Sequence, residues 1–100
     1  MDELHFEWDQ NKNDTNLKKH NISFEEAQTV FLDEHALLID DPDHSQEEER
    51  FILLGFSLQA KLLVVCHCYR QSNNVIRLIS ARKATKTEAK TYTKQREWGD

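Results

Sequence analysis

Lys61-Leu-Leu-Val-Val-Cys-His-Cys-Tyr-Arg70 and Val75-Ile-Arg-Leu-Ile-Ser-Ala-Arg82 form a predicted β-hairpin, joined by Gln71-Ser-Asn-Asn74. Both runs are rich in β-branched and other apolar residues, which favour strands, and a cluster of turn-forming polar residues separates them. The hairpin also carries a dense set of side chains that can contact an anion, namely His67, Tyr69, Arg70, Arg77, Arg82 and Lys83. The hairpin therefore predicts part of a sheet and also supplies the candidate site.

The length and composition set the class of protein. With 100 residues, the chain has room for one domain, residues 1–100, with one modest core. Hydrophobic residues make up 38% and charged residues 31%, which is typical of a folded soluble protein. No apolar run approaches the roughly 20 residues that span a bilayer. The acidic start, Met-Asp-Glu-Leu-His, does not have the basic and then apolar pattern of a signal peptide. We therefore expect a cytoplasmic protein with no membrane partner.

The two cysteines are predicted to be reduced. Cys66 and Cys68 lie one residue apart on one predicted strand, so their side chains share a face about 7 Å apart. That separation is poorly suited to a disulfide, and unpaired cysteines are typical of intracellular proteins.

Local signals predict the other elements of an α+β fold. Asp9 can cap a first helix, and Asn21 tolerates the left-handed conformation that ends it. Ser23 with Glu26, and Thr85 with Glu88, are capping boxes that open two further helices. The helices are predicted over residues 9–20, 23–32 and 85–98, and the additional strands over 5–8, 36–39 and 50–56.

Hydrophobic patterning assigns buried faces to two of these elements. In the second helix, Phe24, Ala27, Val30 and Phe31 recur at helical spacing and predict a buried stripe. The strand over 50–56 is apolar on both faces except at Arg50, which predicts a position inside the sheet.

The charge is distributed unevenly along the chain. Residues 1–60 hold 4 Lys/Arg and 15 Asp/Glu, a balance of −11, whereas residues 61–100 hold 9 Lys/Arg and 3 Asp/Glu, a balance of +6. This asymmetry indicates an anionic partner for the second half. The alternative is a surface of mixed charge that matters only for solubility.

A set of basic residues is suited to binding phosphate. Arginine presents a planar fork that matches phosphate oxygens, and lysine presents a point charge, so such a set can stabilise a phosphorane-like transition state. The candidates are Arg77, Arg82 and Lys83, with Lys86 and Lys90 in the last helix. In the alternative interpretation the lysines are solvated, and Arg77 and Arg82 pair with one of Glu47 to Glu49.

Three side chains are candidates for proton transfer or base stacking. His67 can act as a general acid or base, because its ordinary pKa lies near 6.5. It is equally consistent with a core histidine that is satisfied by a backbone carbonyl. Tyr69 and Tyr92 can stack a base or carry a proton, although tyrosine more often serves in packing.

The hairpin register decides which of these groups meet. A two- or four-residue turn pairs His67 with Leu78 and would place His67 on the same side as Ser80 and Arg82. A three-residue turn would place His67 opposite Arg77. The sequence is consistent with either register.

No metal site is expected. Cys66-His67-Cys68 lies on one strand, so His67 points away from the two thiols, whereas structural zinc needs convergent ligands. The acidic loop Asp40–Glu49 has no spaced ligand pattern for a divalent ion. We expect this loop to cover the basic surface by ion pairing, and the rival idea is that it binds a metal needed for activity.

Several short motifs run through most of the chain in order. They are Phe6-Glu-Trp-Asp9, Asn16-Leu-Lys-Lys-His20, Ser23-Phe-Glu-Glu-Ala27, Val30-Phe-Leu-Asp33, Asp41-Pro-Asp-His-Ser45, Glu48-Glu-Arg50, Gly55, Leu63-Val-Val65 with His67, and Ile76-Arg-Leu-Ile-Ser-Ala-Arg-Lys-Ala-Thr85. Together they resemble the BrnT family of bacterial toxins, from BrnT–BrnA type II toxin–antitoxin modules. The last motif is the most specific. Asn21 stands where the family usually has glycine, and the acidic net charge of −5 also departs from the family.

The resemblance implies a RelE-like fold, with two N-terminal helices, a twisted and mainly antiparallel sheet, and a C-terminal helix. It implies a ribonuclease toxin that inhibits translation and growth by cleaving RNA without a metal or other cofactor. On that basis the expected catalytic residues are His67, Arg77, Arg82 and Tyr92, and the expected substrate-binding residues are Arg50, Lys83 and Lys86. The implied partner is a BrnA-like antitoxin of ribbon-helix-helix type, through which the complex would reach operator DNA. The alternative is an inert RelE-like module that only docks an antitoxin or RNA.

Overall fold

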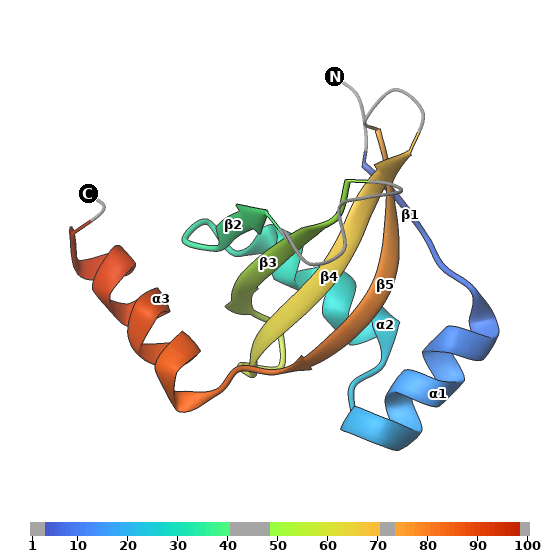
Figure 1. The fold of residues 1–100 in the computed structure, drawn as a ribbon, viewed down its shortest axis with the longest axis horizontal. Coiled ribbons are helices and arrows are strands. Elements are labelled where there is room, and N and C mark those ends of the chain that lie inside the picture. The colour runs from blue at the N-terminus through green and yellow to red at the C-terminus, as the bar shows by residue number, and fades with distance from the viewer. Residues whose placement is uncertain (1–3, 41–48, 71–73, 99–100) are drawn as a thin grey trace.

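A five-stranded mixed sheet organises the protein in its computed structural model, which describes residues 4–40, 49–70 and 74–98 (Figure 1). The strand order is β1-β5-β4-β3-β2. Neighbouring strands are antiparallel, except that β1 runs parallel to β5. The predicted hairpin is confirmed as β4–β5, and β3 lies inside the sheet as expected. The strands are β1 (His5–Glu7), β2 (Leu37–Asp40), β3 (Phe51–Phe56), β4 (Leu62–Arg70) and β5 (Val75–Lys83).

Two helical regions precede β2 and one follows β5. They are α1 (Gln10–His20), α2 (Phe24–Ala27) continued by the 3-10 helix η1 (Gln28–Leu32), and α3 (Lys86–Trp98). The predicted end of α1 is confirmed, because Asn21 has a φ of 59° and its N–H donates to the Leu17 carbonyl. At the other end of α1, the Asp9 carboxylate accepts from two backbone N–H groups.

The second helix differs from its prediction, because only its first part is α-helical. The segment over 28–32 winds as a 3-10 helix. Two β-branched residues, Thr29 and Val30, lie in this segment, and β-branched residues are weak α-helix formers. The Thr29 hydroxyl also donates to the Glu26 carbonyl at 2.7 Å and so satisfies a group at the α-helical end.

The main core lies between α2/η1 and one face of the sheet. Phe24, Ala27 and Val30 are fully buried, and they belong to a cluster with Val65 and Leu78 on the central strands. The predicted stripe is therefore confirmed at these three positions, and Phe31, its fourth member, is partly buried and packs against the same cluster. Fully burying side chains of this size stabilises the fold by about 1.5–3 kcal/mol each, so this face carries much of the stability.

A smaller apolar cluster lies on the opposite face and attaches α3. Tyr92 of α3 is 3% exposed and packs with Leu54 and Val64. In Figure 1, α3 and α1 lie at opposite ends of the view with the sheet between them. Because α3 contacts mainly β3, no described helix covers the part of this second face near β5.

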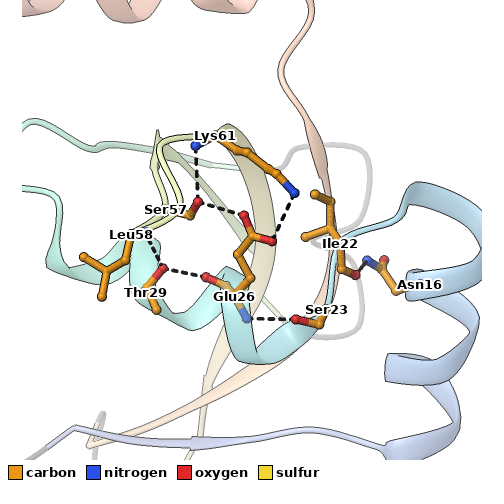
Figure 2. Close-up of polar contacts among 8 residues, drawn as sticks. All are labelled: Asn16, Ile22, Ser23, Glu26, Thr29, Ser57, Leu58 and Lys61. Carbon is orange, nitrogen blue, oxygen red and sulfur yellow. Dashed lines mark hydrogen bonds and ion pairs between the residues drawn. The ribbon is translucent and has the colours of Figure 1, made fainter.

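A polar network ties α2 and η1 to the turn between β3 and β4 (Figure 2). The buried Glu26 carboxylate accepts from the Ser57 hydroxyl at 2.8 Å and lies 3.6 Å from the Lys61 ammonium. The Ser23 hydroxyl accepts from the Glu26 N–H, as its capping box predicts. The Glu26 carboxylate, however, binds the turn instead of the cap, so this box also fixes the packing between elements.

The same turn predicts a stabilising substitution. Ala60 adopts a φ of 63°, a left-handed conformation that costs a residue with a Cβ about 1–2 kcal/mol. Ala60→Gly should therefore raise the free energy of unfolding by about 0.5–1 kcal/mol, since part of the gain is offset by the flexibility of glycine in the unfolded chain. Urea unfolding measures this change. Ala89→Gly, inside α3, is the control and should lower stability by about 1 kcal/mol. A loss at both positions would contradict the prediction.

Candidate functional site

A β-bulge in the hairpin decides which side chains share a face. Near the turn, His67 pairs with Leu78, as one of the two predicted registers requires. The register then shifts, and Cys66 pairs with Ser80, which leaves Ile79 as an extra residue on β5. Because an extra residue inverts the alternation of faces, Ser80 lies on the side opposite His67.

The bulge therefore corrects both predicted arrangements around His67. Arg82 pairs with Val64, an odd number of residues from His67, so Arg82 and His67 point to opposite faces. Arg77 pairs with Cys68 and also lies on the face opposite His67. The sheet thus separates the predicted phosphate-binding arginines from the predicted proton shuttle.

The sheet face that α3 partly covers contains a shallow pocket of about 300 Å³. Two residues predicted for the site line it, Arg50 immediately before β3 and Arg82 on β5. Ser80 adds a hydroxyl from the bulge. Its lining residues are Arg50, Ile52, Val64, Cys66, Ile79, Ser80 and Arg82.

Arg82 is held in the pocket by a bidentate ion pair. Its Nη1 and Nη2 donate to the two carboxylate oxygens of Glu88 at 2.8 and 2.9 Å, and Nη1 also donates to the Lys83 carbonyl at 3.2 Å. The hydrogen bond from Arg82 lowers the pKa of Glu88 to about 2, against the effect of burial. The hydrogen bond to Glu88 likewise raises the pKa of Arg82. Both groups are therefore charged throughout the physiological range.

The ion pair leaves one edge of the guanidinium open. A guanidinium has five N–H donors, and the contacts to Glu88 and Lys83 use three of them. The N–H of Nε and the second N–H of Nη2 have no hydrogen-bond partner in the part of the chain that the structure describes. These two donors form a fork of the kind that binds two oxygens of one phosphate.

The predicted capping box of α3 positions Glu88. The Thr85 N–H donates to Glu88 Oε1 at 2.8 Å, and the Glu88 N–H donates to the Thr85 hydroxyl at 3.2 Å. The carboxylate that closes this box also pairs with Arg82. The first turn of α3 therefore fixes the orientation of the guanidinium.

Arg77 also has a glutamate partner, which comes from β1. Its Nη1 donates to Glu7 at 2.9 Å, and the two residues are paired directly across β1 and β5. The alternative interpretation paired Arg77 and Arg82 with one of Glu47 to Glu49. Among the described residues, Arg77 pairs with Glu7 and Arg82 with Glu88, and Glu47 and Glu48 lie outside the described ranges.

His67 lies fully buried on the opposite face. Its ring packs edge-on against Phe31 and Tyr69, with centroids 4.9 and 5.4 Å away. Nδ1 lies 3.2 Å from the Val65 carbonyl, to which it can only donate, and Nε2 has no hydrogen-bond partner among the described residues. Burial lowers the pKa of His67, and the Val65 carbonyl only partly offsets this. The structure therefore matches the core-histidine alternative.

Burial of neutral His67 predicts that stability falls in mild acid. Its folded-state pKa lies below the ordinary value of 6.5, so below pH 6.5 the unfolded chain binds the proton more readily. The free energy of unfolding should fall by up to about 1.4 kcal/mol per pH unit until the folded-state pKa is reached. His67→Phe should remove this dependence between about pH 5 and 6.5. The exposed-site variant His5→Gln should keep it, and an unchanged slope in His67→Phe would contradict the prediction.

Tyr92 joins α3 to the rest of the fold. Its hydroxyl donates to Asp33 at 2.7 Å, and its ring packs edge-on against Phe56 at 5.3 Å. Burial and the hydrogen bond to Asp33 raise the pKa of Tyr92 to about 12. Burial would raise the pKa of Asp33, but hydrogen bonds from Phe56 N–H, Tyr92 and His35 N–H lower it overall.

The predicted lysines lie at the edge of the site. Lys83 and Lys86 are exposed, at the end of β5 and the start of α3. Strand alternation directs Lys83 away from the face of Arg82, although a lysine side chain is long and flexible. Neither lysine lines the arginine pocket.

The described part of the chain contains neither a metal cluster nor a membrane-spanning helix. Among the residues described, no group of three or more His, Cys, Asp or Glu side chains could hold a metal ion. The acidic segment proposed as a metal loop lies mostly outside those residues. No helix within the described ranges is long and apolar enough to cross a membrane.

Sequence reasoning missed the residues that orient the arginines. Glu88 was assigned only to the capping box of the last helix. It lies six residues after Arg82, so it could also have been considered as the ion-pair partner of that arginine. Glu7 became a partner only through the parallel pairing of β1 with β5, for which local sequence carries no signal. Asn16 was not predicted, yet it is buried and bonded to β5.

Comparison with known proteins identifies relatives of the chain. Residues 8–88 match the family model described as the ribonuclease toxin BrnT of type II toxin–antitoxin systems. The structure is similar to the crystal structure of the Brucella abortus ribonuclease toxin, BrnT, with a TM-score of 0.60 and 18% identity, over 86% of this chain and 100% of that chain. Among curated proteins there is no significant match. Since the family model covers most of the chain, the protein belongs to the BrnT family of ribonuclease toxins of type II toxin–antitoxin systems.

Proposed function

We propose that this chain is an RNA-cleaving toxin whose reaction takes place at the Arg50–Arg82 pocket. The observation that carries the proposal is that Arg82 lines this pocket and that its Nε and second Nη2 N–H groups have no hydrogen-bond partner among the described residues. Glu88 holds the opposite edge, so Arg82 is already oriented before a phosphate arrives. Pre-organised donors of this kind stabilise charge that develops in a transition state.

The proposed reaction uses the RNA 2′-hydroxyl as nucleophile. A bond forms from the 2′-oxygen to the adjacent phosphorus, and the bond from phosphorus to the 5′-oxygen breaks. The products are a 2′,3′-cyclic phosphate and a 5′-hydroxyl, and the proton passes from the 2′-oxygen to the 5′-oxygen through solvent. Arg82 and Arg50 would stabilise the extra negative charge on the phosphorane-like transition state.

The remaining predicted residues have supporting roles in this proposal. Lys83 and Lys86 bind phosphates that flank the scissile one, because both are exposed beside the pocket. Arg77 orders the sheet edge through Glu7. We assign His67 to the core and Tyr92 to the attachment of α3, because both side chains are buried and neither lines the pocket.

Several finer features belong to the same proposal. The reaction is metal-independent, since guanidinium groups supply the positive charge at the phosphate. Cleavage of cytoplasmic RNA removes templates and so inhibits translation and growth. The fold over residues 1–100 is one domain of RelE-like type. A BrnA-like ribbon-helix-helix antitoxin neutralises the toxin, and it alone reads operator DNA. Membership of a type II toxin–antitoxin family supports such a partner.

A second candidate function is an inert module that docks an antitoxin or RNA. The pairing of Arg77 with Glu7 and of Arg82 with Glu88 favours it, because each arginine is already neutralised. One experiment separates the two functions. Purified protein is incubated with RNA in EDTA beside Arg82→Ala, with Lys94→Ala, an exposed α3 lysine, as control. Cleavage by wild type and Lys94→Ala that is lost in Arg82→Ala supports the toxin, and no cleavage by any of them overturns it.

A further inference from the structure

The side of β5 that faces away from β4 has different neighbours along its length. β1 pairs with β5 only over Val75 to Arg77. Further along, α1 lies beside the strand, and the buried Asn16 takes the place of a strand neighbour. Its amide donates to the Ala81 carbonyl at 2.8 Å, and its side-chain oxygen accepts from the Ala81 N–H at 3.1 Å. The bulge residues Ile79 and Ser80 lie between these two regions.

A hollow of about 400 Å³ opens between α1 and β5 at this place. Its floor includes Ile79 and Ser80, which also line the Arg50–Arg82 pocket. The two hollows therefore adjoin at the bulge, one on the sheet face and one at its edge. The α1 hollow is lined by Asp9, Asn11, Lys12, Thr15, Asn16, Lys19, His20, Ile79 and Ser80.

The α1 hollow has a positive wall. Lys12 and Lys19 lie seven positions apart on one helix face, roughly 10 Å along the axis, and His20 follows. Both lysines are exposed, and neither has an ion-pair partner within residues 4–40, 49–70 and 74–98. The one acidic residue of the hollow, Asp9, already accepts from two backbone N–H groups at the start of α1. The free positive charge is therefore suited to an anion.

We propose that this α1 hollow binds the phosphate backbone of single-stranded RNA, adjacent to the segment held at Arg82. This inference rests on the proposed function, because it extends the same substrate across the bulge. A backbone that passes from the sheet face to the sheet edge must bend around β5. A flexible single strand can follow that path, and basic grooves of this kind track single strands by their phosphates.

The test measures binding separately from cleavage. Lys12→Ala/Lys19→Ala is compared with the control Lys18→Ala/Lys94→Ala, which removes the same two charges from exposed positions outside both hollows. The probe is a labelled 2′-O-methyl RNA of about 12 nucleotides, which cannot be cleaved and is long enough to reach both hollows. A trinucleotide of the same chemistry is the short probe. Fluorescence anisotropy at several salt concentrations gives the dissociation constants.

We expect the Lys12/Lys19 variant to bind the long probe about tenfold more weakly than the control does, with a salt slope reduced by about 1.4. Both double variants should bind the trinucleotide equally. Equal binding of the long probe by both variants would overturn the inference, even if the wild type cleaves RNA. A selective loss of binding in a protein that cleaves nothing would support the α1 site and would count only against the proposed reaction.

Discussion

Arg82→Lys is expected to lower kcat/KM for RNA cleavage by about 100-fold or more, although it preserves the positive charge. Lysine has no planar fork, so it cannot bind Glu88 on one edge and phosphate on the other. Removing one pre-organised donor from a developing oxyanion typically costs about 10²–10³ in rate. The measurement is initial-rate cleavage of a fluorogenic RNA in EDTA.

The control for this change is Arg96→Lys, which makes the same replacement at an exposed position in the last turn of α3. It should keep activity within about twofold of the wild type, since surface substitutions away from a site have small effects. If Arg82→Lys is as active as Arg96→Lys, charge alone is sufficient. The proposed role of the open Nε/Nη2 edge would then be wrong.

The pair of Arg82 and Glu88 also determines the behaviour of this site in acid. The pKa of Glu88 falls to about 2 in the fold, from 4.5 for an ordinary glutamate. A carboxyl group with a lowered folded-state pKa contributes stability that is fully present above its unfolded pKa and is lost as pH falls towards the folded pKa. The orientation of Arg82 should therefore persist at pH 4 and fail only between about pH 4 and pH 2.

Local chemistry explains why most elements could be predicted from the sequence. Helix ends depend on nearby residues, so Asp9, Asn21 and the Thr85–Glu88 box each indicated a boundary that the structure confirms. Strand positions followed from apolar runs bounded by turn residues. The 3-10 ending of the second helix was missed, because Thr29 not only bonds the Glu26 carbonyl locally but also accepts from the Leu58 N–H of the distant β3–β4 turn.

The arrangement of the candidate site could not be predicted, because it depends on contacts that are distant in sequence. One extra residue, Ile79, inverts the faces of β5 and separates Arg82 from His67. A bulge leaves no reliable mark in a run of apolar and small residues. The same limit applies to Arg77, whose partner comes from a parallel strand about 70 residues earlier in the chain.

Asn16→Ala is expected to lower the free energy of unfolding by about 3 kcal/mol or more, because it leaves buried backbone groups without partners. Asn16 is 6% exposed and makes two hydrogen bonds with Ala81. A third goes to the carbonyl of Ile22, which Figure 2 draws beside Asn16. The buried residues of α1 are Asn13 and Asn16, whereas its apolar Leu17 is 47% exposed. Amide hydrogen bonds, and not an apolar stripe, therefore attach α1 to β5.

Thermal and urea unfolding test this prediction. A loss of about 3 kcal/mol corresponds to a fall in Tm of roughly 12 °C or more for a domain of this size. Asn11→Ala, a change at an exposed asparagine of the same helix, should keep stability within about 0.5 kcal/mol of the wild type.

Asn16→Asp separates hydrogen bonding from shape. Its buried carboxylate lacks the two donated bonds at neutral pH but regains an O–H donor when protonated, so this variant should gain stability relative to wild type as pH falls from 7 to 5. Equal stability of Asn16→Ala and Asn11→Ala would mean that packing alone holds α1 against β5.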